Sequence, residues 1–361
     1  MRNETLNITL GRSEDGFPVT LDLKNSANLH LLLCGRSGEG KTVEAQNIIN
    51  QLAKQGETVL TCNIHGALDD DQILPAFRET FNMYRNDIQA HDHGIPFGFF
   101  EPLEFPDGTR ESLEDAAGAT SDIIARAMKF GVNQRAVLRI AIENAFKNSH
   151  GRAIKFSDIA HQLRGGGTRI TSELYERLHF LFTRNLFVEG NDAITTGRIN
   201  ILQLDKFDLE IQEIIQEFIL SCVWRLANTG LFKEHNLWLF IDECQNVNSE
   251  SNSSLARMIS EGRKMGVNLI LATQMVLQGT TNTVQQRLPQ AGLMLFCKPA
   301  ANRMALTAKM ISPGDVDTWV LRLRNLRVGE FVAVGNYCIA GLPISYPVII
   351  DARIPNAADA E

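Results

Sequence analysis

One short segment, residues 35–42, constrains the fold of this chain more than any other. It reads GRSGEGKT and matches the pattern G-x-x-x-x-G-K-[ST]. An almost wholly apolar run, Leu29 to Cys34, precedes it, and a helical pattern from about Lys41 to Lys54 follows. In that context, glycines let backbone N–H groups turn around phosphate groups at the N-terminus of a helix. The segment therefore predicts a phosphate-binding loop between a buried strand and a helix.

This loop predicts ATP and Mg²⁺ as cofactors, with different roles for its last two residues. Lys41 is expected to reach the β- and γ-phosphates, and Thr42 is expected to ligate Mg²⁺. The expected nucleotide-binding residues are Gly35, Arg36, Ser37, Gly38, Glu39, Gly40, Lys41 and Thr42.

A second apolar run, residues 237–241, ends in two carboxylates, Asp242 and Glu243. This is the Walker B arrangement, in which Asp242 holds Mg²⁺ through water and Glu243 orients and polarises the attacking water. A metal-bound aspartate alone would also suit a kinase. The adjacent glutamate favours hydrolysis.

A third strand is expected at residues 267–272, and it is followed by Gln274. A polar amide at the tip of a strand can contact both the γ-phosphate and the lytic water and can couple them to loop movement. We therefore place Gln274 with Glu243 among the candidate catalytic residues.

The order of the elements predicts an α/β fold. Apolar and polar residues alternate in Ile8 to Leu10 and Val19 to Leu23, which indicates an N-terminal β-hairpin. Strands that alternate with helices indicate a mostly parallel sheet flanked by helices. Further strand candidates are residues 58–64, 199–204, 293–296 and 331–334.

Between the strands lies a stretch with a different pattern, residues 67–197, which we interpret as a mainly helical insertion. Helical periodicity marks residues 112–147, 156–163 and 172–182. The ATPase core then comprises residues 1–66 and 198–353, and residues 354–361 are expected to form a flexible tail.

Composition narrows the class of protein. The 361 residues are 44% hydrophobic and include six cysteines without a C-x-x-C pair, which excludes disordered and disulfide-stapled chains. We find no apolar run of the roughly 18 residues that a membrane span needs, and no signal peptide, so we expect a cytoplasmic protein. The net charge of −7 excludes a basic DNA-coating protein, although it leaves room for a ring with a locally basic pore.

Residues 261–274 read EGRKMGVNLILATQ. This stretch resembles the signature of the HerA branch of the HerA/FtsK superfamily, ring-forming P-loop ATPases that pump DNA. Residues 59–69 resemble the family's second strand and turn, although Asn63 and Ala67 replace acidic residues there. Residues 10–23 resemble the hairpin of FtsK-like motors, and residues 95–103 resemble a segment shared with conjugation-type secretion ATPases.

The resemblance implies a RecA-like P-loop NTPase that assembles into a homo-oligomeric ring, expected to be a hexamer, and translocates double-stranded DNA. ATP would be hydrolysed between subunits, where a neighbouring arginine stabilises charge on the γ-phosphate. Arg263, inside the signature, is our first candidate for this arginine, and Arg287 and Arg303 are the next.

Two other functions remain open from the sequence. One is an ATPase ring that acts on protein partners in secretion or assembly, which the acidic balance of the chain favours. The other is a nucleotide-dependent scaffold that activates a nuclease or another effector protein in antiviral defence.

Overall fold

The computed structural model describes residues 6–24, 26, 28–64, 66–150, 152–184, 186–188, 190, 193–248, 253–274 and 288–354. The chain divides into two compact units. The first comprises Met1–Asn86, Thr196–Ile201 and Phe232–Glu361, and the second comprises Asp87–Thr195 and Leu202–Leu231.

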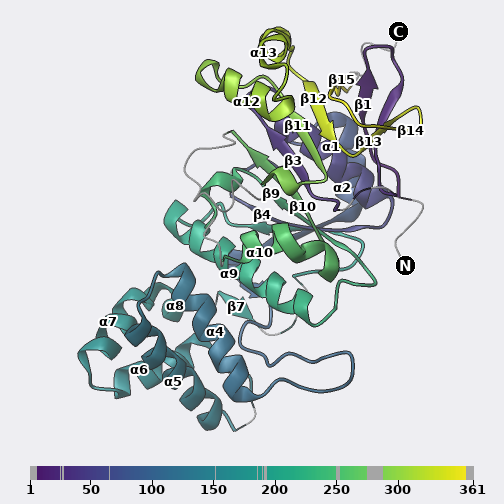
Figure 1. Ribbon diagram of the computed structural model, residues 1–361. Coiled ribbons are helices and arrows are strands. Elements are labelled where there is room, and N and C mark those ends of the chain that lie inside the picture. Colours follow the sequence, from purple (N-terminus) through teal and green to yellow (C-terminus); the bar gives the residue numbers. More distant parts are fainter. Residues whose placement is uncertain are drawn as a thin grey trace. The chain divides into compact units, whose positions relative to one another are not determined.

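At the centre of the first unit, parallel strands lie side by side in one sheet, and their residues are buried on both faces of the sheet (Figure 1). Apolar runs of this kind can be buried only where helices cover both sides of a sheet. The neighbouring strands are, in spatial order, β11 (Leu293–Phe296), β3 (Leu31–Cys34), β10 (Val267–Thr273), β9 (Leu237–Ile241) and β4 (Thr58–Asn63). Beyond β4 the sheet continues with β8 (Ile199–Gln203) and β5 (Arg85–Gln89).

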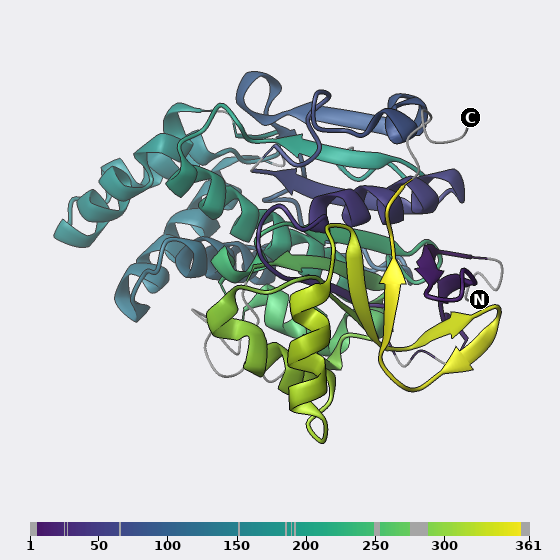
Figure 2. The same ribbon diagram turned by 90° about the horizontal axis from the view of Figure 1, so that it is seen from above.

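The other half of the sheet is antiparallel. The expected N-terminal hairpin is present as β1 (Thr9–Ser13) and β2 (Pro18–Leu21). Figure 2 shows the C-terminal strands, in yellow, beside this purple hairpin, and the pairings of β15 with β1 and of β13 with β2 agree. Besides β12 (Glu330–Gly335), these strands are β13 (Tyr337–Ile339), β14 (Leu342–Ile344) and β15 (Val348–Asp351).

Helices of the first unit connect these strands. Helix α1 (Lys41–Lys54) has the bounds that its apolar spacing predicts, and it buries Ile48, Ile49 and Leu52 in the main core. The others are α2 (Pro75–Tyr84), α10 (Ser254–Glu261), α12 (Met304–Ile311) and α13 (Val316–Asn325).

The second unit is mainly helical. Its longest helices are α4 (Leu113–Ala127), α5 (Val132–Asn148) and α9 (Leu209–Asn228). Shorter elements are α3 (Ala90–His93), α6 (Phe156–Gly165), α7 (Arg169–Arg177), α8 (His179–Thr183), and the paired strands β6 (Ile95–Pro96) and β7 (Phe187–Val188).

The helical unit contains a break that the periodic pattern of its sequence does not indicate. The periodic stretch 112–147 is two helices, because the chain turns at Lys129, whose φ of 53° lies in the left-handed region. Helix α2 belongs to the sheet unit, and α9 belongs to the helical unit. Most of the expected tail lies outside the described residues.

No helix in the described ranges has the length and apolar character that crossing a membrane requires.

Candidate active site

The three sequence motifs meet at one edge of the sheet because their strands are parallel neighbours. Strand β10 pairs with β3, with Thr273 opposite Cys34, and pairs with β9, with Leu271 opposite Ile241. The phosphate loop, the paired carboxylates and Gln274 each follow the carboxyl end of one of these strands. Ligands of open α/β sheets bind at this edge.

The phosphate loop is shaped by glycines and fixed to the neighbouring strands. Gly35, Gly38 and Gly40 have φ values of 151°, 80° and 102°, which side chains rarely adopt. A Cβ atom on Gly35 would lie 2.2 Å from the Cys297 sulfur, so this position accepts only glycine. The backbone N–H of Gly35 donates a hydrogen bond of 3.2 Å to the Thr273 carbonyl, and the backbone N–H of Arg36 donates one of 3.2 Å to the Lys298 carbonyl.

The loop holds Lys41 in its concave side. Lys41 is buried, and its Nζ donates to the carbonyl oxygens of Gly35 at 2.8 Å and Arg36 at 3.1 Å. Glu39 is also buried and accepts a hydrogen bond from Arg36 Nε. Gly40 is the N-cap of helix α1 and has no side chain to satisfy the first N–H groups of the helix, so these groups can bind an anion.

Asp242 and Glu243 lie at the end of β9. Asp242 Oδ1 accepts a hydrogen bond of 2.9 Å from the backbone N–H of Glu243. Glu243 has φ of 47°, a left-handed conformation that costs a non-glycine residue roughly 1–2 kcal/mol. Hydrogen bonds to the side chain of Glu243, the candidate hydrolytic carboxylate, hold the residue in this strained conformation.

Those hydrogen bonds come from two glutamine amides. Gln274 Nε2 donates to Glu243 Oε1 at 2.6 Å, so the structure brings together the two residues that the motifs nominate. Gln245 Nε2 donates to Glu243 Oε2 at 2.5 Å. The carboxylate is thus oriented through both oxygens.

Gln245 is a site residue that the sequence reasoning missed. Its Oε1 accepts a hydrogen bond of 2.6 Å from the Thr273 hydroxyl, so Gln245 joins the ends of β9 and β10. The only signal in the sequence is its position two residues after Glu243. Its partner Thr273 is distant in the chain and becomes predictable only once the strand pairing is known.

Buried thiols lie behind the loop. Cys34, Cys244 and Cys297 follow or end neighbouring strands and are all free. Burial raises the pKa of Cys34 well above its usual value and raises the pKa values of Cys244 and Cys297 to about 12. These thiols therefore stay protonated and are poor nucleophiles.

The candidate arginines lie elsewhere. Arg263 is exposed and lies in the turn before β10, at the opposite end of this seven-residue strand from Gln274. At about 3.3 Å per residue, that is roughly 20 Å, too far for Arg263 to reach the site of its own chain. Arg303 is half-buried before α12, and Arg287 lies outside the described residues.

The glycines of the EGRKMG stretch have a packing role. Gly266 has φ of 77°, and a Cβ atom there would lie 1.8 Å from the Phe232 carbonyl oxygen. A Cβ atom on Gly262 would lie 2.8 Å from the Val267 carbonyl oxygen. Part of this signature therefore serves the close approach of backbone segments.

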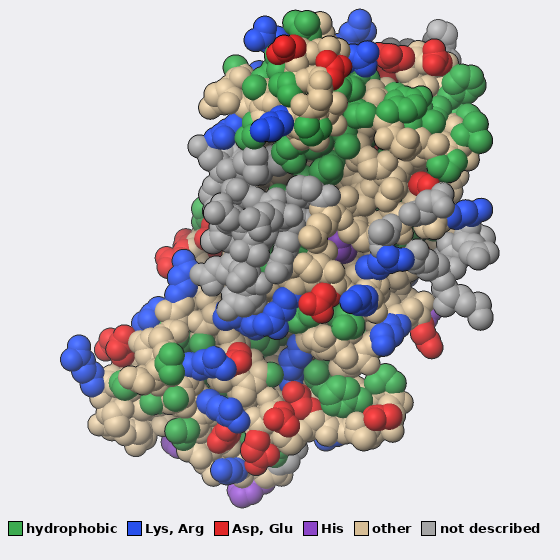
Figure 3. All heavy atoms as spheres, viewed as in Figure 1, with side chains coloured by type: hydrophobic (Ala, Val, Ile, Leu, Met, Phe, Trp, Pro, Cys, Tyr) green, Lys and Arg blue, Asp and Glu red, His purple; other side chains and the backbone are tan. Residues whose placement is uncertain are grey.

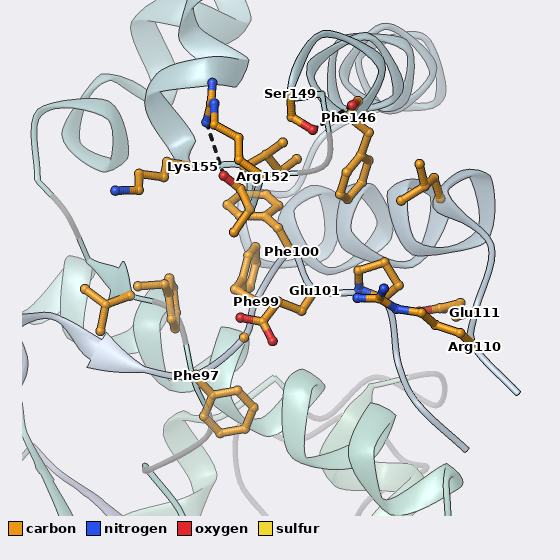
Figure 4. A pocket seen from close by; sticks show the side chains of 17 residues that line it. Phe97, Phe99, Phe100, Glu101, Arg110, Glu111, Phe146, Ser149, Arg152 and Lys155 are labelled. Atoms are coloured by element: carbon orange, nitrogen blue, oxygen red, sulfur yellow. Dashed lines mark hydrogen bonds between the residues drawn. The ribbon is translucent and has the colours of Figure 1, made fainter. Parts of the chain in front are cut away.

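The helical unit contains a cavity of about 820 Å³. Figure 4 shows Phe97, Phe99 and Glu101 on one wall, facing Phe146 and Arg152. Its polar groups are engaged locally: Glu101 accepts a hydrogen bond from the backbone of Gly190, and Arg152 is paired with Asp158. Within the described ranges there is no cluster of three or more residues that could hold a metal ion.

Comparison with known proteins identifies the family and the fold of this chain. A family model described as "Helicase HerA, central domain" matches residues 8–223. VirB4 of Thermoanaerobacter pseudethanolicus superimposes with a TM-score of 0.69 at 15% identity, over 98% of each chain. The plasmid coupling protein TrwB, in complex with the non-hydrolysable ATP analogue ADPNP, superimposes with a TM-score of 0.57 at 15% identity, over 92% of this chain and 87% of TrwB.

At these identities the structural matches show the fold, and they confirm the predicted α/β P-loop architecture. TrwB has also been solved in complex with ADP and Mg²⁺. No curated protein sequence matches the chain.

Proposed function

Because the chain belongs to the family of the HerA helicase central domain, we propose that it is an ATP-hydrolysing motor that forms a ring, a hexamer, and translocates double-stranded DNA. The observation that carries this proposal is the contact between Gln274 and Glu243 at the edge of the sheet where the phosphate loop lies. A carboxylate oriented in this way beside a phosphate loop suits hydrolysis of a phosphoanhydride.

The chain's own residues then divide the work. Lys41 and the N–H groups of the phosphate loop bind the phosphates. The carbonyl groups of Gly35 and Arg36, which accept hydrogen bonds from Lys41, position its ammonium group inside the loop. Glu243 orients the attacking water and accepts its proton. Gln274 holds Glu243 through one oxygen, so a movement of the β10 end changes the position of the carboxylate.

The residues fit a magnesium ion by their chemistry. Thr42, in the first turn of α1, and Asp242, at the end of β9, supply the hydroxyl and carboxylate oxygens that Mg²⁺ prefers. When bound there, the ion would neutralise charge on the phosphates. Asp242 also fixes the backbone of Glu243, so one carboxylate supports both tasks.

An arginine from a neighbouring subunit completes the proposed site. Arg263 is exposed and remote from its own phosphate loop, which suits a role on a neighbour's nucleotide. In a mixture of Glu243→Gln and Arg263→Ala subunits, some interfaces carry both an intact arginine and an intact Glu243. We expect such mixed rings to recover part of the hydrolysis rate. Inactive mixed rings would move the proposal to Arg303 or Arg287.

DNA binding is proposed to occur without sequence preference, through backbone phosphates. On the face drawn in Figure 3, basic and acidic side chains are interspersed over the helical unit, so this face has no uniformly basic surface. The proposed positive charge therefore belongs to the pore of a ring, where copies of one inward cation add up.

Free cysteines support a reducing compartment, and we propose a cytoplasmic location.

We also propose that the mainly helical segment of residues 67–197 is an insertion in an ATPase core made by residues 1–66 and 198–353.

The deciding experiment measures ATP hydrolysis with and without double-stranded DNA at two salt concentrations. We expect DNA to stimulate hydrolysis at low salt and to lose this effect at high salt, because each phosphate contact releases counterions. The Glu243→Gln variant controls for contaminating ATPases. Hydrolysis that DNA leaves unchanged, in assembled rings that do not bind DNA, would refute the DNA motor and favour action on protein partners, which the net charge of −7 suits.

A further inference from the structure

The cavity of the helical unit contains none of the residues assigned to nucleotide binding or hydrolysis. All of its lining residues belong to the second compact unit, so the cavity is formed within a single body. Its volume, about 820 Å³, falls within the range of roughly 300–1,000 Å³ that is usual for ligand sites. The cavity is therefore large enough for a ligand of its own.

One wall of the cavity is a cluster of phenylalanine rings. Phe99 stacks on Phe187 with ring centroids 4.6 Å apart, and Phe99 meets Phe100 edge to face at 5.0 Å. These three side chains are buried, and Phe146 lies on the opposite side of the cavity (Figure 4). Because the rings pack on one another, they hold a fixed arrangement. An apolar side chain that enters the cavity would contact this aromatic wall.

The cavity opens to solvent beside exposed apolar side chains. Leu113 lines the cavity and is 46% exposed. Phe105 is 36% exposed and lies in the adjoining loop, whose ends Glu104 and Arg110 form an isolated β-bridge. A small molecule confined to the cavity would leave both apolar side chains in water. A peptide can fill the cavity with one side chain and cover the rim with its neighbours.

The loop that carries Arg110 is fixed at its base. Glu111 N donates to the Leu103 carbonyl at 2.8 Å, and Leu103 N donates to Glu111 Oε2 at 3.0 Å. The same carboxylate pairs with Arg225 of α9, and these two side chains are only 13% and 12% exposed. Arg110 is exposed and forms no ion pair within the described ranges, so its positive charge is not compensated.

A second excess of positive charge lies across the aromatic wall. Arg152 is paired with Asp158, and the backbone N–H of Lys155 donates to the same carboxylate at 2.8 Å. Two cations thus accompany one carboxylate here, and the Lys155 side chain is exposed. Figure 4 shows Lys155 and Arg110 on opposite sides of Phe100.

The two carboxylates of the cavity lining, Glu101 and Glu111, are already engaged. Glu111 pairs with Arg225, and Glu101 accepts a hydrogen bond of 3.3 Å from the backbone N–H of Gly190. The cations on the two sides are therefore the charges left to meet a ligand, and they favour an anionic one.

We propose that this cavity binds an acidic peptide segment of a partner protein. One large apolar side chain of the segment lies against Phe99 and Phe100, and flanking carboxylates meet Arg110 on one side and Lys155 on the other. The buried apolar side chain supplies most of the affinity. Exposed ion pairs add little affinity, and they select acidic over basic segments. The proposal goes beyond the proposed motor function and does not depend on it.

The test is a selection of short random peptides displayed on phage, carried out in parallel on the full-length wild type and on Ala153→Phe. Ala153 lines the cavity, so a phenylalanine side chain there occupies its space. We expect the wild type alone to enrich peptides in which Asp or Glu flanks Leu, Phe or Trp. The most enriched peptide, labelled with fluorescein, is then measured against each variant by fluorescence anisotropy.

The variants separate the roles of charge and shape. Arg110→Glu is expected to weaken binding of the labelled peptide about 10-fold, because attraction to its carboxylates becomes repulsion. Ala153→Phe is expected to abolish binding, whereas Ala153→Ser, which adds little volume, retains it. Arg169→Glu makes the same change in net charge at an exposed position of α7 outside the cavity, and it should bind as the wild type does.

Binding of a fluorescent ATP analogue and thermal unfolding check that each variant is folded. Arg110→Glu changes an exposed side chain, so it tests the proposal even where Ala153→Phe does not fold. Enrichment of basic or uncharged peptides, no enrichment, or an acidic peptide that binds Arg110→Glu as tightly as the wild type would overturn the proposal. Loss of DNA binding or of self-association in Ala153→Phe, with no peptide selected, would assign the cavity to DNA or to a second copy instead. Normal peptide binding by a wild type that does not hydrolyse ATP would count against the proposed function alone.

Discussion

His30 is expected to make the stability of the sheet unit depend on pH. It is buried just before β3, and its two ring nitrogens have different partners. Nδ1 accepts a hydrogen bond of 3.1 Å from Leu269 N, and Nε2 lies 3.0 Å from the Met258 carbonyl, to which it donates. Only the neutral ring can accept at Nδ1, so protonation would break the bond to β10.

The pKa of His30 gives the size and the sign of the effect. Burial lowers this pKa from 6.5 to about 4, against the smaller opposing effect of the backbone hydrogen bonds. The unfolded chain therefore binds a proton more readily, and stability falls as the pH decreases from about 6.5 to about 4. Between about pH 7.5 and pH 5, the loss is about 2 kcal/mol from this residue alone.

The assay compares the wild type with His30→Gln in urea unfolding followed by tryptophan fluorescence. Glutamine can accept from Leu269 N and donate to the Met258 carbonyl without titrating. The free energy of unfolding of the wild type should then fall by about 2 kcal/mol more than that of the variant over the same pH range. His93→Gln, at an exposed position, controls for the loss of a histidine. Parallel pH profiles for the wild type and His30→Gln would refute the reasoning.

Further predictions concern the active site and its helix. Lys41→Ala should abolish binding of a fluorescent ATP analogue, while Glu243→Gln should bind it normally and not hydrolyse ATP; turnover by Glu243→Gln at the wild-type rate would contradict the assignment. Gln245→Ala should lower kcat about 10-fold with KM little changed, because the carboxylate loses one of its two amide partners. Steady-state kinetics should show that Thr273→Ser, which keeps the hydroxyl, retains the wild-type kcat. Burial raises the pKa of Glu44, whose Oε1 has no hydrogen-bond partner. The stability that its protonated form gives is present at low pH and is lost as pH rises, so Glu44→Gln should raise the free energy of unfolding by about 1 kcal/mol at pH 8 and not at pH 4; an equal effect at both would be inconsistent with a buried, protonated carboxyl.

Local patterns account for what the sequence predicted well. The bounds of α1 follow from a glycine-rich loop and an apolar stripe that are both encoded within about 20 residues. Strands β9 and β11 coincide with the predicted runs because a strand buried on both faces is apolar throughout. The superfamily and the α/β fold class are both confirmed.

The antiparallel strands β13 to β15 were not predicted. These strands are only three or four residues long and mostly partly exposed, so their apolar residues are too few to mark them as strands. They become strands because β13 pairs with β2 and β15 pairs with β1, which are more than three hundred residues away in the chain.

The sequence alone determined the phosphate loop, the paired carboxylates and Gln274, because each follows a strand that its own residues define. Only the tertiary structure decided that Gln245 links Glu243 to Thr273. The physical reason is that polar contacts depend on which strands are neighbours and in what register. That pairing minimises the free energy of the whole sheet, and no short segment encodes it.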